Sequence, residues 1–235
     1  MVFPIHGVYF ICCITNYMQV IKEQFELLIK CGLYQKTTKL IIFICLCKDD
    51  IKEYLTSIDI DNKFVLVTTE DNLYEKFAIN NFKAYITDEP YYLYYFHAKG
   101  LSHYGDSDSQ VYVNRRLILT YYTIIQHEVN IKLLSHFDAV GCALSAYPKT
   151  HFSGNFWWSK SKYINTLVDK IGDGYLAPEM YILSRPFGKF ISLSQKSNNA
   201  SLLYYHVQRS EEDIFENATT VPIYNEWDKK YITQC

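Results

Sequence analysis

The sequence predicts an α/β fold, with an open, mostly parallel β-sheet flanked by helices. Three observations predict it. Strand-like and helix-like segments alternate along residues 7–80, which is the pattern of parallel strands joined by crossover helices. The strand-like runs are continuously apolar, as is typical of strands covered on both faces. No internal repeat, low-complexity tract or Pro/Gly-rich linker interrupts the 235 residues, so we expect a single domain spanning 1–235.

The first half of the chain supplies most of the sheet. The expected strands are Gly7–Ile14, Leu40–Leu46, Phe64–Thr68 and Tyr92–Phe96. The expected helices are Tyr17–Lys30, Lys48–Ser57 and Asn72–Asn80. Thr15 and Asn16 are residue types that cap helix N-termini, and Gly32 stands where a helix C-terminal glycine is expected.

The second half is organised differently, with one long helix and shorter strands. The expected helices are Val113–Leu134 and Lys160–Val168, and the expected strands are Ala139–Leu144 and Phe152–Ser159. Pro178 and Glu179 predict one more helix start, because proline is favoured at the first helical position and acidic residues in the first turn.

The direction of the strands predicts where a ligand binds. Open α/β sheets bind ligands outside the carboxyl ends of their parallel strands. The loops after Ile14, Leu46 and Thr68 are therefore expected to form one wall of a pocket.

Composition and charge exclude several classes of protein. Apolar residues make up 49% and charged residues 20% of the chain, which indicates a globular protein and not a disordered one. The formal net charge of −2 gives no general attraction to nucleic acid or anionic membranes. No apolar run approaches the roughly 20 residues that span a bilayer, and the N-terminus has no signal-peptide pattern. We expect a cytoplasmic protein without a nucleic-acid partner.

The seven cysteines are expected to be free thiols. Cys12, Cys13, Cys45 and Cys47 lie in apolar, strand-like runs, where unpaired thiols are common core residues. Their spacing does not match a zinc site. The sequence therefore predicts a reducing compartment.

A first candidate site follows the strand Tyr92–Phe96. The residues there are His97-Ala98-Lys99-Gly100. A lysine beside a glycine turn can reach a phosphate while backbone N–H groups approach it closely, and His97 can donate as well. The alternative interpretation is a strand-ending turn with a solvated lysine.

A second candidate site surrounds Trp157 and Trp158. In an extended segment these rings point to opposite faces, so one is expected to pack in the core and the other to offer a platform to a sugar ring. Polar residues that can bind hydroxyl groups precede them: His151, Ser153, Gly154 and Asn155. The alternative interpretation, two core tryptophans, explains the rings but not the polar residues beside them.

Charged residues elsewhere give weaker candidates. Glu179 alone is typical of a residue that stabilises a helix N-terminus. Asp106 and Asp108 have the Asp-x-Asp spacing that often holds a divalent cation under a diphosphate, in a polar loop close to Lys99. Arg115 can clamp a phosphate through two N–H groups, and a solvated pair with Arg116 is the alternative.

Four blocks of the sequence occur in an order that resembles a known family. They are Tyr95–Ser102, Phe137–Cys142, His151–Trp158 and Glu179. This order is similar to that of glycosyltransferase-like proteins of bacteria and large DNA viruses, whose first block is Tyr-x-His-Thr-Lys-Gly and whose third is His-(Phe/Tyr)-Ser-Gly-Asn-Phe-Trp-Trp. The resemblance covers most of residues 5–185.

The resemblance implies a GT-A-like fold with a nucleotide-binding half at about 1–110 and an acceptor or sugar half at about 111–235. It also implies an enzyme that moves a sugar from a nucleotide-diphosphate sugar to a glycan or protein hydroxyl. Catalytic roles are then expected for Glu179 or Asp138 as the carboxylate and for His151. Substrate contacts are expected from Thr15, Asn16, His97, Lys99, Gly100, Arg115, Ser153, Gly154, Asn155, Trp157 and Trp158.

The chain departs from the GT-A pattern at one position that matters. In that fold the Asp-x-Asp metal motif usually ends a central strand near residue 100, where this chain has His97-Ala98-Lys99. Either Lys99 and Arg115 replace a Mn²⁺ or Mg²⁺ cation, or Asp106 and Asp108 hold it, or transfer activity is lost.

Two further expectations accompany this departure. Loss of activity would leave a carbohydrate-binding protein or a virion structural protein on the same scaffold. The many Ile, Asn, Lys and Tyr residues, which have AT-rich codons, are consistent with a giant-virus origin, and hence with a host-cytoplasm or virion location.

Overall fold

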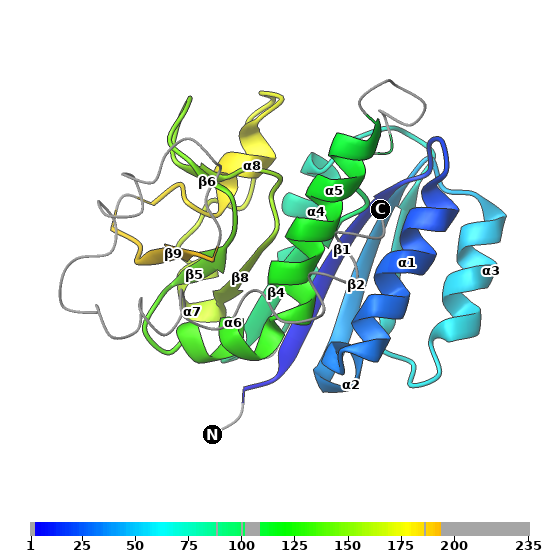
Figure 1. Ribbon diagram of the computed structural model, residues 1–235, viewed down its shortest axis with the longest axis horizontal. Coiled ribbons are helices and arrows are strands. Elements are labelled where there is room, and N and C mark those ends of the chain that lie inside the picture. The colour runs from blue at the N-terminus through cyan, green and yellow to red at the C-terminus, as the bar shows by residue number, and fades with distance from the viewer. Residues whose placement is uncertain (1–2, 88, 100, 102–108, 186, 194–235) are drawn as a thin grey trace.

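A seven-stranded, mostly parallel sheet forms the centre of the molecule (Figure 1), so the expected fold class is confirmed. The computed structural model describes residues 3–87, 89–99, 101, 109–185 and 187–193. The strands run in the order β3-β2-β1-β4-β8-β5-β9. Their bounds are β1 Ile5–Cys12, β2 Thr37–Cys45, β3 Phe64–Thr69, β4 Tyr92–His97, β5 Ala139–Gly141, β8 Trp157–Lys160 and β9 Phe190–Ser192.

The direction of each strand sets which loops can meet. The neighbouring pairs among β3, β2, β1 and β4 are parallel, and so is the pair β5–β9. β8 lies between β4 and β5 and is antiparallel to both. A separate antiparallel pair is formed by β6 (Leu144–Ser145) and β7 (His151–Phe152). β4, from the predicted nucleotide-binding half, therefore pairs with β8 from the other half.

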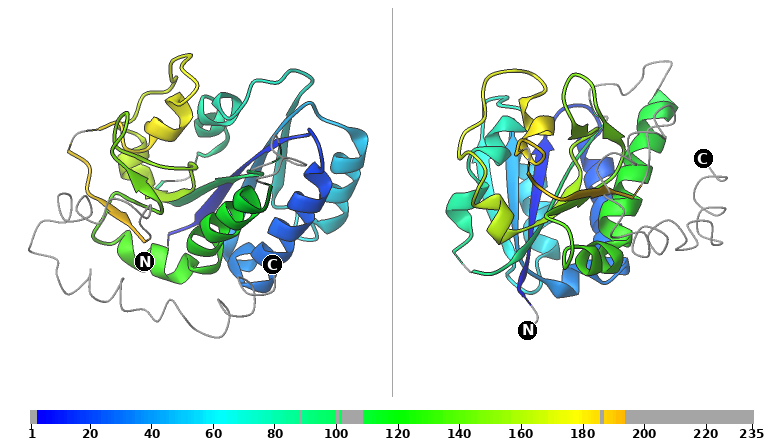
Figure 2. Two further views of the ribbon diagram at one scale, coloured as in Figure 1. Left: turned by 45° about the horizontal axis from the view of Figure 1, so that its top comes forward. Right: turned by 90° about the vertical axis from the view of Figure 1, so that its left-hand side faces the viewer.

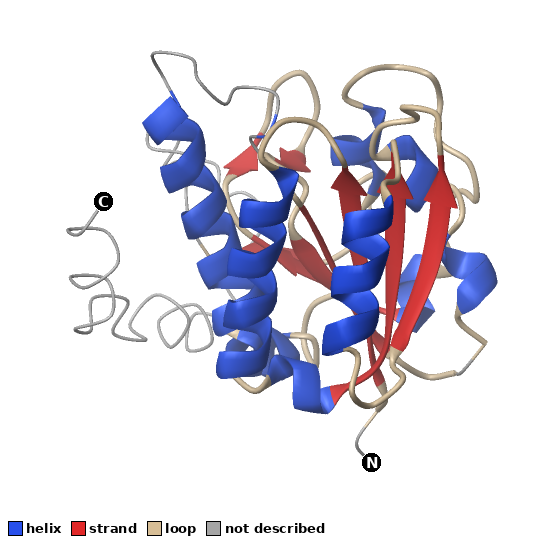
Figure 3. Cartoon of the chain, turned by 90° about the vertical axis from the view of Figure 1, so that its right-hand side faces the viewer, coloured by secondary structure: helices blue, strands red, loops and turns tan. Residues whose placement is uncertain are grey.

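Helices cover both faces of this sheet (Figure 2). The three long ones lie together on one face, where Figure 3 shows them against the strands: α1 (Tyr17–Lys30), α3 (Asp49–Ile58) and α5 (Ser109–Thr120). The short helices are α2 (Leu33–Lys36), α4 (Lys76–Ile79), α6 (His127–Leu133), α7 (Ser161–Ile164) and α8 (Ala177–Tyr181). A 3₁₀ turn spans Phe82–Tyr85.

Two apolar cores, one on each face, follow from the alternation of side chains along the strands. Tyr94 and Trp158 pack with α1, α3, α5 and α6 in the first core. Tyr95 and Trp157 pack with α4, α7 and α8 in the second. Among the described residues no helix is long and apolar enough to cross a membrane. The six cysteines in this part of the chain are free thiols, as expected, and Cys235 lies outside it.

The first-half elements follow the sequence closely. The helix Tyr17–Lys30 has the predicted bounds, and Gly32 adopts φ of 84° directly after its last turn, as a helix C-terminal glycine does. Asn16 takes the N-cap position, as expected, with φ of 54°, although its side chain makes no capping hydrogen bond. The helix predicted over Asn72–Asn80 is reduced to the single turn of α4, and the one over Lys160–Val168 to that of α7.

The long helix predicted over Val113–Leu134 is interrupted by a π-helical turn at Tyr121–Ile125. A π turn releases backbone carbonyl groups from the regular helical pattern. The Trp158 indole N–H donates to the Thr123 carbonyl (2.7 Å), and the Asn130 amide donates to the Tyr122 carbonyl (2.7 Å). Side chains from β8 and α6 therefore satisfy the groups that the break exposes.

Candidate functional site

The carboxyl ends of β1, β2 and β3 lie at one edge of the sheet, as the strand directions predicted. Backbone hydrogen bonds join the loops that follow them, from Cys13 N–H to the Cys45 carbonyl (3.0 Å) and from Cys47 N–H to the Thr69 carbonyl (3.2 Å). Thr15 and Asn16 are exposed in the first of these loops. Each loop is therefore bonded to the last residue of the neighbouring strand, and the expected pocket wall stays a prediction.

Hydrogen bonds from buried side chains hold the backbone of the turn after β4. The Gln24 amide donates to the His97 carbonyl (3.2 Å), and the Arg116 guanidinium donates to the Lys99 carbonyl (3.3 Å). Arg116 is itself buried and paired with Glu23 (3.2 Å). These contacts place Lys99 at the same edge as the loops after β1–β3.

The lysine turn and the tryptophan block meet, although 57 positions separate them. The His97 Nε2 atom lies 2.8 Å from the Gly154 carbonyl oxygen. A carbonyl can only accept, so Nε2 carries the proton. Burial lowers the pKa of His97, with Glu75 opposing the shift, so the ring is neutral near pH 7. An atom built as Cβ on Gly154 would lie 3.4 Å from Lys99 Cε, so the lysine stem runs beside this glycine.

A two-residue left-handed turn presents the polar groups of the second block. The strand predicted over Phe152–Ser159 is broken here, because Gly154 has φ of 101° and Asn155 has φ of 55°. The Asn155 amide donates to Glu75 Oε2 (2.7 Å), while its oxygen accepts from the Trp157 indole (2.9 Å). Asn155 is thus buried and bonded within the protein.

Glu179 closes the cluster from α8, whose predicted start at Pro178 is confirmed. Its Oε1 atom accepts the Gly154 N–H (3.1 Å), and its Oε2 atom lies 3.5 Å from His151 Nε2. The other ring nitrogen of His151 donates to the Lys149 carbonyl (2.7 Å). The Glu179 side chain stays 18% exposed, so a ligand can reach the carboxylate.

Glu75 is a site residue that the sequence did not single out. It precedes α4, and its Oε2 atom accepts from the Tyr95 hydroxyl (3.2 Å) and from Asn155. Its Oε1 atom lies 3.5 Å from His97 Nε2, and the side chain is 20% exposed. No motif marks this position, because its partners lie 20 and 80 residues further along the chain.

Arg115 adds a second cation to this edge. Its guanidinium donates to the Ser153 hydroxyl (2.5 Å), next to the Gly154 turn. Burial lowers the pKa of Lys99, while Glu75 and Glu179 raise it and Arg115 lowers it further, so all four charges act on one another. We call Glu75, His97, Lys99, Arg115, His151 and Glu179 the carboxyl-edge cluster. The positive charges of its lysine and arginine equal in number the negative charges of its two glutamates.

Two expected site residues are placed elsewhere. Trp157 and Trp158 are both 0% exposed, so the expectation that one ring forms an open sugar platform is wrong. Trp157 stacks on Tyr95 at 5.3 Å between ring centroids, and Trp158 lies against Tyr94 at 5.0 Å. Both faces of the sheet are covered by helices, so each ring enters a core.

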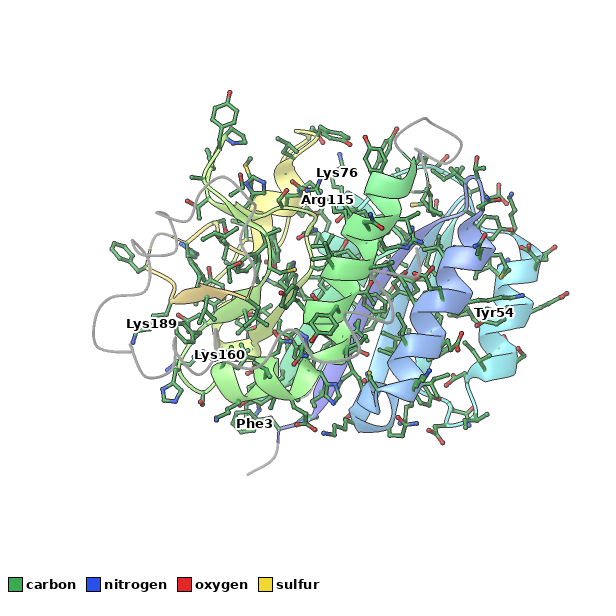
Figure 4. The ribbon with its side chains drawn as sticks, viewed as in Figure 1. Phe3, Tyr54, Lys76, Arg115, Lys160 and Lys189 are labelled. Atoms are coloured by element: carbon green, nitrogen blue, oxygen red, sulfur yellow. The ribbon has the colours of Figure 1, made fainter. Side chains whose placement is uncertain are left out.

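Asp138 does not join the cluster, and its expected catalytic role stays a prediction. It precedes β5, at the amino end of that strand, where it pairs with Lys160 (3.0 Å) and accepts the Lys189 N–H (2.9 Å). Figure 4 shows both lysines toward the same end of the molecule as Phe3, with Arg115 and Lys76 toward the other. Gly100, Asp106 and Asp108 lie outside the described residues.

Replacing Gly154 with alanine is expected to lower the free energy of unfolding by about 2–3 kcal/mol. The new Cβ would lie 2.7 Å from Leu119 Cδ1, in a backbone conformation that side chains rarely adopt. Gly172→Ala is the matched control, because nothing lies within 4 Å of its added Cβ. Urea unfolding measures both variants. If the two variants were equally stable, the claim that the Gly154 turn has no room for a side chain would be wrong.

Comparison with known protein families identifies one that matches the chain. Residues 14–173 match the family described as Domain of unknown function (DUF8361). No curated protein matches the chain.

Solved structures resemble the chain at low sequence identity. Rv0371C from Mycobacterium tuberculosis, solved with manganese, is 10% identical, with a TM-score of 0.45 and coverage of 81% of this chain and 88% of that one. HddC from Yersinia pseudotuberculosis, complexed with GMP-PN, is 12% identical, with a TM-score of 0.45 and coverage of 80% and 89%. The mannosyltransferase PcManGT from Pyrobaculum calidifontis, in complex with GDP-Man and Mn²⁺, is 12% identical, with a TM-score of 0.42. That match covers 74% of this chain and 49% of the mannosyltransferase.

Proposed function

The chain belongs to the family described as Domain of unknown function (DUF8361), and we propose that it is a glycosyltransferase that uses a nucleotide-diphosphate sugar. The observation that carries the proposal is the meeting of Lys99, Arg115 and Glu179 around the Gly154 turn. This turn lies at the carboxyl edge of a parallel sheet, where α/β proteins bind their ligands. The GT-A-like resemblance of the sequence supports the same reading.

Lys99 and Arg115 are the proposed contacts of the donor diphosphate. Lys99 offers a point charge on a largely buried stem, and Arg115 offers a planar group with several N–H donors. Both lie beside the Gly154 turn. Together they would stabilise the negative charge that the leaving nucleoside diphosphate develops as its bond to the sugar breaks.

Glu179 is the proposed carboxylate at the reacting carbon. In the inverting form of the reaction, the acceptor hydroxyl oxygen attacks the anomeric carbon and loses its proton to Glu179, while the bond from that carbon to the diphosphate oxygen breaks. The nucleoside diphosphate then departs with that electron pair. Positioned proton transfer of this kind contributes about 10²- to 10⁴-fold to a rate. His151 faces Glu179 at 3.5 Å and would fix its orientation.

The described residues do not supply a ready site for a divalent cation. No group of three or more His, Cys, Asp or Glu side chains in this part of the chain is arranged to hold one. Glu75 and Glu179 also already accept hydrogen bonds from Asn155 and the Gly154 backbone. Among the described residues, Lys99 and Arg115 are the proposed contacts of the diphosphate, while Asp106 and Asp108 lie outside this part of the chain.

A carbohydrate-binding protein without transferase activity is the second candidate. One observation favours it: β4 ends in His97, followed by Ala98 and Lys99, where the GT-A pattern usually has Asp-x-Asp. Such a protein would bind a glycan but no nucleotide.

A thermal-shift screen against UDP, GDP and their sugar conjugates, with Mn²⁺ and with EDTA, tests the proposal. A ligand that binds only the folded state raises the melting temperature, by an amount equivalent to about 2.7 kcal/mol at a hundredfold excess over Kd. We expect at least one nucleotide to do so, followed by slow hydrolysis or transfer of its sugar. Stabilisation by glycans with no response to any nucleotide would support the second candidate instead.

A further inference from the structure

We propose that Glu75 is a positioning residue, which ties the end of β4 to the Gly154–Asn155 turn and places a negative charge at the turn beside which Lys99 lies. The inference rests on the proposed function only in assigning Lys99 to an anionic donor. The link between Glu75 and Lys99 can be measured without any donor.

The geometry places Glu75 between two segments that must stay aligned. One carboxylate oxygen accepts from Tyr95 in β4 (3.2 Å) and from Asn155 in the turn (2.7 Å). The other faces His97 at the end of β4 (3.5 Å). The His97 ring in turn holds the Gly154 carbonyl at 2.8 Å. Glu75 and His97 therefore both connect the end of β4 to the Gly154–Asn155 turn.

Charge explains why a carboxylate occupies this position. Tyr95 and Asn155 both donate hydrogen bonds to Glu75, and an ionised carboxylate is the side chain that accepts from several donors at once. Glu75 bonds to Asn155, and the stem of Lys99 lies beside the neighbouring Gly154, so both side chains adjoin the same turn. A carboxylate there stabilises the ammonium that burial disfavours. Glutamine would preserve the shape, but it would bring an N–H group toward these donors and remove the negative charge.

The direction of the expected effect follows from the pKa of Lys99. Burial lowers that pKa, and Glu75 is the largest influence opposing the shift. Removing the charge of Glu75 therefore lowers the pKa of Lys99 further, so the ammonium loses its proton at a lower pH. A charge at this range changes a pKa by about one unit or more.

Labelling with acetic anhydride across pH 6–11 reports the protonation state of Lys99, because only the neutral amine reacts. The fraction of Lys99 acetylated in a short pulse is measured by peptide mass spectrometry. In Glu75→Gln the half-maximal point is expected about one pH unit lower than in the unmodified chain. Glu70→Gln, which removes the same charge from an exposed position in the same loop, is expected to leave the profile of Lys99 unchanged.

Further variants keep the test decisive if Glu75→Gln does not fold. Glu75→Asp retains the charge but withdraws it by one carbon, so a smaller shift in the same direction is expected. Tyr95→Phe removes one hydrogen bond and no charge, so it reports what a purely structural role would do. A profile for Glu75→Gln, or failing that for Glu75→Asp, that coincides with the one for Glu70→Gln would overturn the proposal.

The same variants separate this inference from the proposed function. If UDP and GDP bind the unmodified chain, their affinity in Glu75→Gln is expected to decline at a lower pH, in step with the labelling profile. If neither binds, the proposed donor fails. A shifted Lys99 profile would still establish the role of Glu75.

Discussion

Glu179→Gln is expected to reduce sugar transfer by about 100- to 10 000-fold while donor affinity stays within about threefold. Glutamine keeps the oxygen that accepts the Gly154 N–H (3.1 Å), so the turn is preserved. It cannot take a proton from an acceptor hydroxyl. Initial rates at saturating donor, together with calorimetric titration of the donor, separate the two effects. A variant with unchanged rate would remove Glu179 from the reaction.

Asp138→Asn is the comparison that decides between the two carboxylates the sequence left open. Asp138 pairs with Lys160 at the amino edge of the sheet, away from Lys99. Its removal is expected to cost about 1 kcal/mol in stability and nothing in transfer rate. A loss of rate in Asp138→Asn, at unchanged fold, would contradict the site at the carboxyl edge.

Lys99→Met is expected to weaken donor binding by about tenfold to a hundredfold, the range of a hydrogen bond to a charged group. Methionine keeps a stem of similar length beside Gly154 but has no charge. Glu75 and Glu179 would then face the diphosphate with only Arg115 to balance them, so the upper part of this range is expected. Titration with the nucleotide that gives the largest thermal shift measures the change.

Lys76→Met controls for the loss of any positive charge at this edge. Lys76 lies toward the same end of the molecule as Arg115 (Figure 4), and its partner Asp173 is almost fully exposed. Exposed pairs contribute little to stability, so this variant is expected to bind the donor within about twofold of the unmodified chain. Equal weakening in both lysine variants would point to general attraction rather than to a contact by Lys99.

The sheet of the first half could be predicted from sequence because local and tertiary preferences agree there. Gly7–Cys12 of β1 and Leu40–Cys45 of β2 are continuously apolar and almost entirely buried, so nothing competes with the strand conformation. The bounds of α1 follow from its apolar periodicity and from Gly32. The position of Lys99 at the sheet edge follows in turn, since it comes two residues after β4 ends.

The second half shows where such reasoning fails. Aromatic residues at both ends of 152–159 favour a strand, but Gly154 and Asn155 between them are residue types that favour a left-handed turn, which they adopt. The contacts of this turn with Glu75, His97 and Glu179 are long-range, so no window of the sequence contains them. The burial of Trp157 and Trp158 depends in the same way on helices from both halves.

Two carboxylates illustrate the limit of motif reading. The family resemblance makes Asp138 a candidate, because it lies in the block Phe137–Cys142, but only the direction of β5 reveals that it stands at the amino end. Glu75 carries no motif, and its role is visible only once Tyr95 and Asn155 are brought to it.

The antiparallel direction of β8 determines where the chain can tolerate inserted residues. Because β8 enters the sheet at Trp157, beside Tyr95, and leaves it at Lys160, beside Tyr92, its preceding loop reaches the ligand edge and its following loop does not. Residues added directly after α7 would enter the chain before it returns to the opposite edge, where Asp173 pairs with Lys76. A single residue added between Phe152 and Trp157 would displace the carbonyl and N–H of Gly154 from both of their partners at once.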